Sequence, residues 1–250
     1  MSKKQLLTET TLRIPGAWGG FEEITGRLPH GYSMCDAGLV MPDGQVVEMF
    51  PMKPDKEFAA VFESSCRAPA TSEELSILNR YTVSLGLVGP GGSLEAARTM
   101  LRAGAAILQT GRAGAGGAGV FVDNSLLAHG ATNWTEMATV DDIEAITFAF
   151  VGIIRQKLDV RTVGMNVLGK PDLVMSRRDF DENNDSIIDL IRYVASSKKK
   201  IGDRHIMAME SGTQFQSEVL ETDDAPVGSP SHNPSGRLRL VNLKTIGELN

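Results

Sequence analysis

The sequence predicts an α+β protein whose helices pack on mostly antiparallel sheet, with a ferredoxin-like first half followed by a larger α/β half. Two observations favour this class. The first ninety residues read as strand, helix, hairpin, helix and strand, which matches the β-α-β-β-α-β order of ferredoxin-like folds. Residues 81–172 then alternate strands with helices. We therefore expect a ferredoxin-like part at 1–92 and an α+β part at 93–250, packed together as one compact unit.

The clearest local signal in the first part is the turn Met41-Pro42-Asp43-Gly44. It predicts a hairpin between residues 32–40 and 45–50, because proline presets the turn and glycine accepts a positive φ. Ser72 is the expected N-cap of a short helix, with acids in its first turn. The other predicted elements of this part are strands at 6–14 and 81–88 and helices at 21–26 and 53–67.

A long helix opens the second part, with Ser93 as its expected N-cap. Its inner face is Leu94, Ala97, Leu101, Gly104 and Leu108, at helical spacing. Gly104 costs helix stability, so we expect it to admit the close approach of another backbone. The other expected elements are strands at 120–122, 161–167 and 173–175, a helix at 185–195, a hairpin at 205–210 and 213–219, a loop at 221–236 and a strand at 237–243.

Thr139-Val140-Asp141-Asp142 fits the pattern Ser/Thr-x-x-acid that starts a helix. The predicted helix runs through Ile154 and is apolar on most of its sides. Such a helix is either enclosed within the protein or covered by a second copy of the chain. The second alternative is compatible with a homodimer.

Charge and composition narrow the classes of partner. The formal net charge is −6 and no long basic stripe offsets it, so we expect no nucleic acid. Lys198-Lys199-Lys200 is interpreted as a solvated turn that ends a helix, against the alternative of a phosphate-binding patch. No segment has the length and apolarity of a membrane span or a signal peptide, so we expect a cytoplasmic protein that does not bind membranes.

The sequence contains no metal-ligand spacing. Its two cysteines, Cys35 and Cys66, fit neither a metal site nor a disulfide framework, and are interpreted as reduced thiols. The four histidines show no HxxxH or HxH pattern. We therefore expect no metal site.

Three segments carry a family resemblance: residues 117–125, the preceding helix 94–108, and Thr162-Val163-Gly164-Met165 with Leu168-Gly169-Lys170-Pro171-Asp172. They resemble the bacterial family catalogued as domain of unknown function 4261, mainly over residues 81–176. Family members often carry a histidine where this chain has Asn79-Arg80-Tyr81, which argues against a role for that histidine. The resemblance implies a shared α+β framework and no known activity. By analogy with similarly catalogued families, it keeps a toxin-neutralising immunity role open.

Two glycine-rich segments are candidate phosphate-binding sites. Residues 114–119 spell G-x-G-x-x-G, but a helix precedes the motif and a strand follows it, which is the reverse of the dinucleotide-binding order. We expect a connection there and no cofactor. Gly89-Pro90-Gly91-Gly92-Ser93 has the better order, and its free N–H groups could bind a carboxylate or phosphate. Glu95 opposes an anion at that place, and a plain helix start is the simpler interpretation.

The densest polar cluster is residues 123–134. His129 could act as a general base, with Asp123 or Asn124 orienting it and Ser125 as nucleophile. Trp134 could form an apolar wall. The alternative is a loop whose polar side chains bond their own backbone.

The sequence therefore predicts a binding or interaction protein without a fixed cofactor, whose partner is an unknown small molecule or protein. The expected ligand-binding residues are Ser93, Asn124, Ser125, His129 and Trp134, and no catalytic residue is assigned. The alternatives are a hydrolase or transferase that uses His129 and Ser125, and an immunity-type protein inhibitor. The site depends on one spatial expectation: the strands ending near residues 88 and 122 lie side by side.

Overall fold

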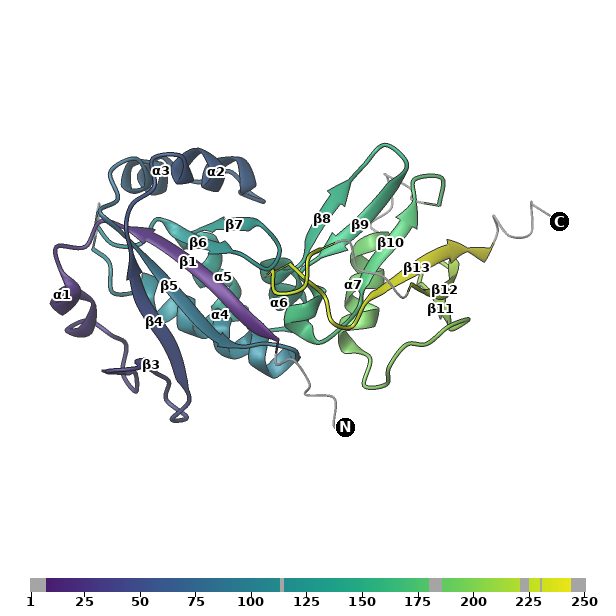
Figure 1. Ribbon diagram of the computed structural model, residues 1–250, viewed down its shortest axis with the longest axis horizontal. Helices are drawn as coiled ribbons and strands as arrows, with labels where there is room; N and C mark the ends of the chain where they lie inside the picture. The colour runs from purple at the N-terminus through teal and green to yellow at the C-terminus, as the bar shows by residue number, and fades with distance from the viewer. Residues whose placement is uncertain (1–7, 113–114, 180–185, 221–224, 230, 244–250) are drawn as a thin grey trace.

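The computed structural model describes residues 8–112, 115–179, 186–220, 225–229 and 231–243. Two largely antiparallel sheets lie toward opposite ends of the long axis, with helices packed on and between them (Figure 1). The α+β class with mostly antiparallel sheet is therefore confirmed. Some predicted positions lie outside the described residues: residues 6 and 7 of the first strand, 114 of the glycine motif, 185 of a helix, and 221–224 and 230 of the loop.

The first sheet has seven strands in the order β2-β3-β4-β5-β1-β6-β7. Its strands are β1 (Glu9–Gly16), β2 (Ser33–Cys35), β3 (Gly38–Val40), β4 (Val46–Met52), β5 (Val83–Pro90), β6 (Gly119–Val122) and β7 (Leu127–Gly130). β5 and β6 both run antiparallel to β1, so they share one direction, and α4 (Leu94–Leu108) connects them. The predicted boundary between residues 92 and 93 falls inside this crossover, and β6 and β7 extend the sheet beyond it.

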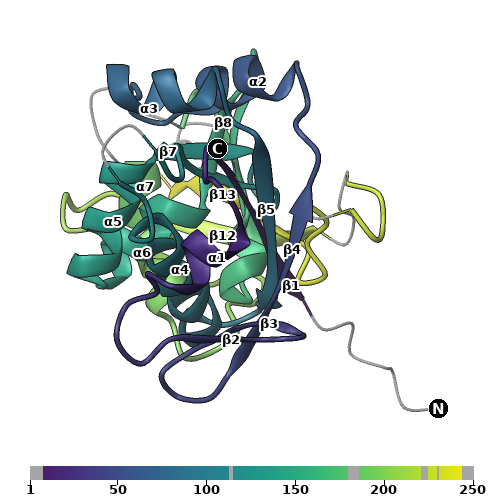
Figure 2. The ribbon, with the colours of Figure 1, turned by 90° about the vertical axis from the view of Figure 1, so that its left-hand side faces the viewer.

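Helices cover both faces of the first sheet. α4 and α5 (Ala131–Val140) lie on one face (Figure 2). α2 (Phe58–Ser65) and α3 (Ser72–Leu78) contribute to a separate apolar cluster in which Phe58 meets Phe121 of β6 edge to face. The short α1 (Phe21–Thr25) follows β1.

The second sheet has six strands in the order β11-β12-β13-β10-β9-β8. They are β8 (Gly152–Arg155), β9 (Asp159–Val163), β10 (Asp172–Ser176), β11 (Ile206–Ala208), β12 (Gln214–Leu220) and β13 (Arg237–Asn242). Only the β10–β13 pair is parallel. The 3₁₀ helix η1 (Met165–Leu168) joins β9 to β10, and α7 (Ser186–Ser196) follows β10 in the chain.

One apolar core joins the two sheets. It contains Leu12 and Val120 of the first sheet together with Val160 and Leu240 of the second. α6 (Ile143–Phe150) lies between the sheets and packs on α4, α5, α7 and β7, while its Phe148 stays 39% exposed. Most of this helix is therefore enclosed within the chain, and the homodimer stays a prediction.

Several local expectations are confirmed. Residues 41–44 form the turn between β3 and β4, with Gly44 at φ 85°. The predicted strand at 32–40 is itself a hairpin of β2 and β3. Ser93 is the N-cap of α4, and its Oγ accepts from the Ala96 N–H at 3.0 Å.

Other predicted helices begin or end at residues different from those expected. Thr71 rather than Ser72 caps α3, because Thr71 forms a reciprocal capping box with Glu74. Asp142 caps α6, while Thr139 belongs to α5. The predicted helix through Ile154 ends at Phe150, because the following residues pair with β9 as strand β8.

The group that packs closely against Gly104 is a side chain and not, as predicted, another backbone. A Cβ at this position would lie 2.7 Å from Nε1 of Trp134, whose indole packs across α4. That indole N–H donates to the Leu101 carbonyl at 2.9 Å. The glycine therefore lets α5 approach α4 closely.

Candidate functional site

The ends of β5 and β6 lie at the same end of the first sheet, with β1 between them. Pro90 pairs with Glu9, and Val122 pairs with Leu12. Asn124 lies beside β1, where its side chain accepts from the Thr11 N–H at 2.9 Å and donates to the Glu9 carbonyl at 3.0 Å. Asn124 is buried and extends the hydrogen bonding of the sheet.

The start of α4 is used within the protein. The N–H groups of Gly92 and Ser93 donate to the Val167 carbonyl at 2.9 and 3.2 Å. A pocket of about 650 Å³ adjoins the preceding glycine loop, and its lining includes Glu9, Asp36 and Glu48. These carboxylates oppose an anion at this place, because like charges repel across a shared pocket.

His129 and Trp134 are brought together, but inside the core. His129 is in β7, with its ring centroid 5.8 Å from those of Trp134 and Phe148. Nε2 lies 3.1 Å from the Ala149 carbonyl, which accepts only if that nitrogen carries the proton. Burial and, to a smaller extent, the charge of Arg67 lower the pKa of His129 to about 4. His129 is therefore neutral near pH 7 and closed to solvent.

Ser125 and His129 do not form a nucleophile–base pair. Ser125 Oγ and His129 Nδ1 are both buried without a hydrogen-bond partner in the described structure, so they do not bond each other. Asp123 is engaged elsewhere, since it accepts from Nε of Arg13 at 2.9 Å. A base that acts on a hydroxyl has to lie within hydrogen-bond reach of it.

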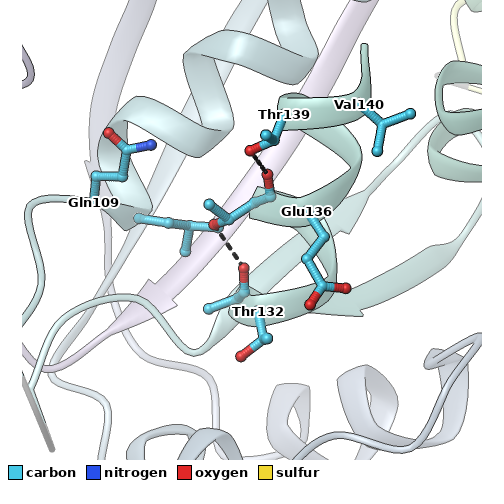
Figure 3. A pocket seen from close by; sticks show the side chains of 8 residues that line it. Gln109, Thr132, Glu136, Thr139 and Val140 are labelled. Carbon is cyan, nitrogen blue, oxygen red and sulfur yellow. Dashed lines mark hydrogen bonds between the residues drawn. The ribbon is translucent and has the colours of Figure 1, made fainter. Parts of the chain in front are cut away.

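The groove between the end of α4 and α5 lacks converging polar groups (Figure 3). It measures about 550 Å³ and contains three threonines of α5. Thr135 and Thr139 direct their hydroxyls into the helix, where they donate to the carbonyls of Ala131 and Thr135 at 2.8 and 2.9 Å. The other polar side chains in its lining are Gln109, Thr132 and Glu136.

A pocket of about 540 Å³ lies between the two halves of the molecule and combines apolar walls with basic groups. We call it the arginine pocket. Arg67 follows α2, Arg155 ends β8, and Arg192 comes from α7. Its apolar residues are Leu127, Phe148, Val151, Ile153, Ile188 and Ile191, and its polar remainder is Ser65, Cys66, Glu144 and Thr147.

Arg67 is held rigidly at one side of the arginine pocket. Its Nη1 and Nη2 donate to the carbonyls of Phe148 and Val151 at 2.6 and 2.8 Å. Its guanidinium carbon lies 4.5 Å from the centroid of the Phe148 ring. These contacts cap the carbonyl end of α6, where a cation is favourable.

The charges in the arginine pocket are unevenly compensated. Arg192 pairs with Glu144 and, at 3.4 Å, with Asp189. Arg67 makes no ion pair with a carboxylate in the described part of the chain. Burial lowers the pKa of Arg67, and the nearby charge of Arg155 lowers it further. Arg67 therefore adds positive charge to its side of the pocket.

The thiol in this pocket is unreactive. Burial and, to a smaller extent, the charges of Glu74 and Glu63 raise the pKa of Cys66 to about 11. A protonated thiol is a poor nucleophile and a poor metal ligand. Cys66 is therefore protonated near pH 7.

The predicted ligand-binding residues lie outside the three pockets described above. The groove, the pocket beside the glycine loop and the arginine pocket have none of them in their linings: Ser93, Asn124, Ser125, His129 and Trp134. The arginine pocket was missed from sequence, because its members lie far apart in the chain and no local pattern marks them. The nearest signal was Arg67, the last residue of the helix predicted at 53–67.

In the described residues no group of three or more His, Cys, Asp or Glu side chains is arranged to hold a metal ion. The same residues include no helix long and apolar enough to cross a membrane. Comparison with protein-family models, with curated proteins and with solved structures finds no match for the chain. The resemblance to domain of unknown function 4261 stays a prediction.

Proposed function

We propose that the protein binds a small organic anion with an apolar body, and that the arginine pocket is its binding site. One observation carries the proposal: Arg67 is fixed by backbone carbonyls and has Arg155 nearby, in a pocket that also has six apolar side chains in its lining. This proposal agrees with the sequence-based prediction of a cytoplasmic binding protein without a fixed cofactor.

The chemistry of the pocket favours a carboxylate joined to a hydrocarbon or aromatic group. Ligand sites of about 300–1,000 Å³ are mostly apolar with a few fixed polar groups, and this pocket fits that description. An anion placed beside Arg67 would be attracted by the positive charge of its guanidinium. A guanidinium held in one orientation can bind a carboxylate with little further loss of entropy.

Titration calorimetry with octanoate tests the proposal. We expect wild-type protein to bind octanoate, and Arg155→Met to weaken that binding at least tenfold. Arg155 is the sharper choice because it is exposed and does not cap α6. Arg204→Met is the matched control, since Arg204 is also exposed and lies outside the pocket. It should bind octanoate as wild type does.

Two further ligands separate charge from apolar contact. Octanamide has the same chain without the charge, and acetate has the charge without the chain. Both should bind at least tenfold more weakly than octanoate. Absence of octanoate binding to the wild type, or equal binding by Arg155→Met and wild type, would contradict the proposal.

A further inference from the structure

Four lysines line a further pocket, of about 400 Å³, which we call the lysine pocket. Lys170 precedes β10, while Lys198, Lys199 and Lys200 follow the end of α7. The remaining lining residues are Gly169, Pro171, Val194, Ile201, Pro234 and Ser235, so no carboxylate of the described residues lines it. This is a local concentration of positive charge on a chain whose net charge is −6.

Capping of α7 does not require the three consecutive lysines. Lysines after a helix commonly complement the partial negative charge of its last carbonyls. Here Lys170, from a different segment, donates its Nζ to the Ser197 carbonyl. The described structure gives Lys198, Lys199 and Lys200 no ion pair with a carboxylate, and all three side chains are exposed. Their charges are thus available at the pocket.

The opposite wall of the pocket is held in place by buried hydrogen bonds. Asn233 is 1% exposed, and its Nδ2 donates to the Lys170 carbonyl and to Oδ2 of Asp172, both at 2.8 Å. The Ser235 N–H donates back to Asn233 Oδ1 at 2.9 Å. These bonds fix Pro234 and Ser235 against Lys170, so the pocket exists before any ligand arrives.

We propose that the lysine pocket binds a small polyanion of the phosphate class. Several ammonium groups around one cavity repel each other, and a ligand with two or more negative charges would offset that repulsion. Ammonium groups on flexible stems suit the several oxygens of a phosphate, which need no single planar orientation. The proposal does not depend on the arginine pocket.

Calorimetry with inorganic pyrophosphate tests this assignment. The pocket variant is Lys198→Ala with Lys200→Ala, which keeps the contact from Lys170 to Ser197. The control is Lys53→Ala with Lys56→Ala, two exposed lysines remote from the pocket lining, which removes the same charge. We expect at least tenfold weaker pyrophosphate binding in the pocket variant and less than a twofold change in the control.

Three results would overturn the proposal. One is that wild-type protein does not bind pyrophosphate in 20 mM salt. The second is an equal loss of affinity in both double variants, which would mean a diffuse effect of net charge. The third is that a single-stranded RNA oligonucleotide binds wild type more tightly than pyrophosphate and loses affinity in the pocket variant, which would indicate a nucleic-acid surface instead.

Discussion

The most unusual single residue is His129, a neutral imidazole enclosed by two aromatic rings. Burial lowers its pKa to about 4 in the folded protein, against 6.5 for an exposed histidine. Between these two pH values the unfolded chain binds more protons than the folded protein does. The contribution of His129 to stability is therefore complete above pH 6.5 and is lost as the pH falls toward 4.

This lowered pKa predicts an acid-sensitive fold. Between pH 7 and pH 5 the free energy of unfolding of wild type should fall by about 2 kcal/mol more than that of His129→Leu. Urea unfolding at the two pH values measures the difference. His30→Leu serves as control, because His30 is exposed and its loss should leave the wild-type pH dependence intact. Parallel pH dependence in wild type and His129→Leu would refute the proton linkage.

At the scale of elements, Glu74 joins the starts of two helices. Its Oε2 accepts from the Thr71 N–H at 2.7 Å at the start of α3, and its Oε1 accepts from the Thr132 N–H at 2.9 Å at the start of α5. The preceding strand has to make room for it, since a Cβ at Gly130 would lie 2.4 Å from Glu74 Oε2. A single buried carboxylate thus fixes α3 relative to α5.

Removing this carboxylate should be costly. We expect Glu74→Ala to lower the free energy of unfolding by about 2–3 kcal/mol, because two helix starts lose a charged acceptor in a buried place. Chemical denaturation measures this change. Glu73→Ala removes the exposed acid next to it in the same helix turn and should cost well under half as much. Similar losses in the two variants would show that the two contacts contribute little.

Elements with local signals were predictable, and those created by tertiary pairing were not. The turn at residues 41–44 and the Ser93 cap depend on side chains within a few residues, so the sequence contains their cause. β7 is only four residues long and includes His129 and Gly130, so it read as loop. Ile153 and Ile154 continue the helical spacing of α6, and only pairing with β9 makes them strand.

The same reasoning explains the binding sites. The expected cluster at residues 123–134 was defined by neighbours in sequence, and folding turned its polar groups inward. Asn124 completes the sheet hydrogen bonds and His129 fills the core. The arginine and lysine pockets instead collect residues from segments far apart in the chain. Periodicity cannot indicate such assemblies, because it reports only which face of an element is buried.

For the whole molecule, the shared core indicates that both sheets unfold together. The core contains Leu12 and Val160, which belong to different sheets, and α6 packs between the two halves. A chain of 250 residues could also form two independently stable units. The two sheets unfold in one transition if the contacts through α6 contribute more free energy than either half has on its own.

A substitution in one half, observed from the other, separates these cases. Val160 is fully buried in β9 of the second sheet, while both tryptophans, Trp18 and Trp134, report on the first half. Val160→Ala should lower the free energy of unfolding by about 1–3 kcal/mol. With one cooperative unit, the urea midpoint measured by tryptophan fluorescence falls together with the midpoint measured by far-ultraviolet circular dichroism.

Val219→Ala, an exposed position in the same sheet, should leave both midpoints near wild type. An unchanged fluorescence midpoint in Val160→Ala, with a shifted dichroism curve, would mean that the two halves unfold independently.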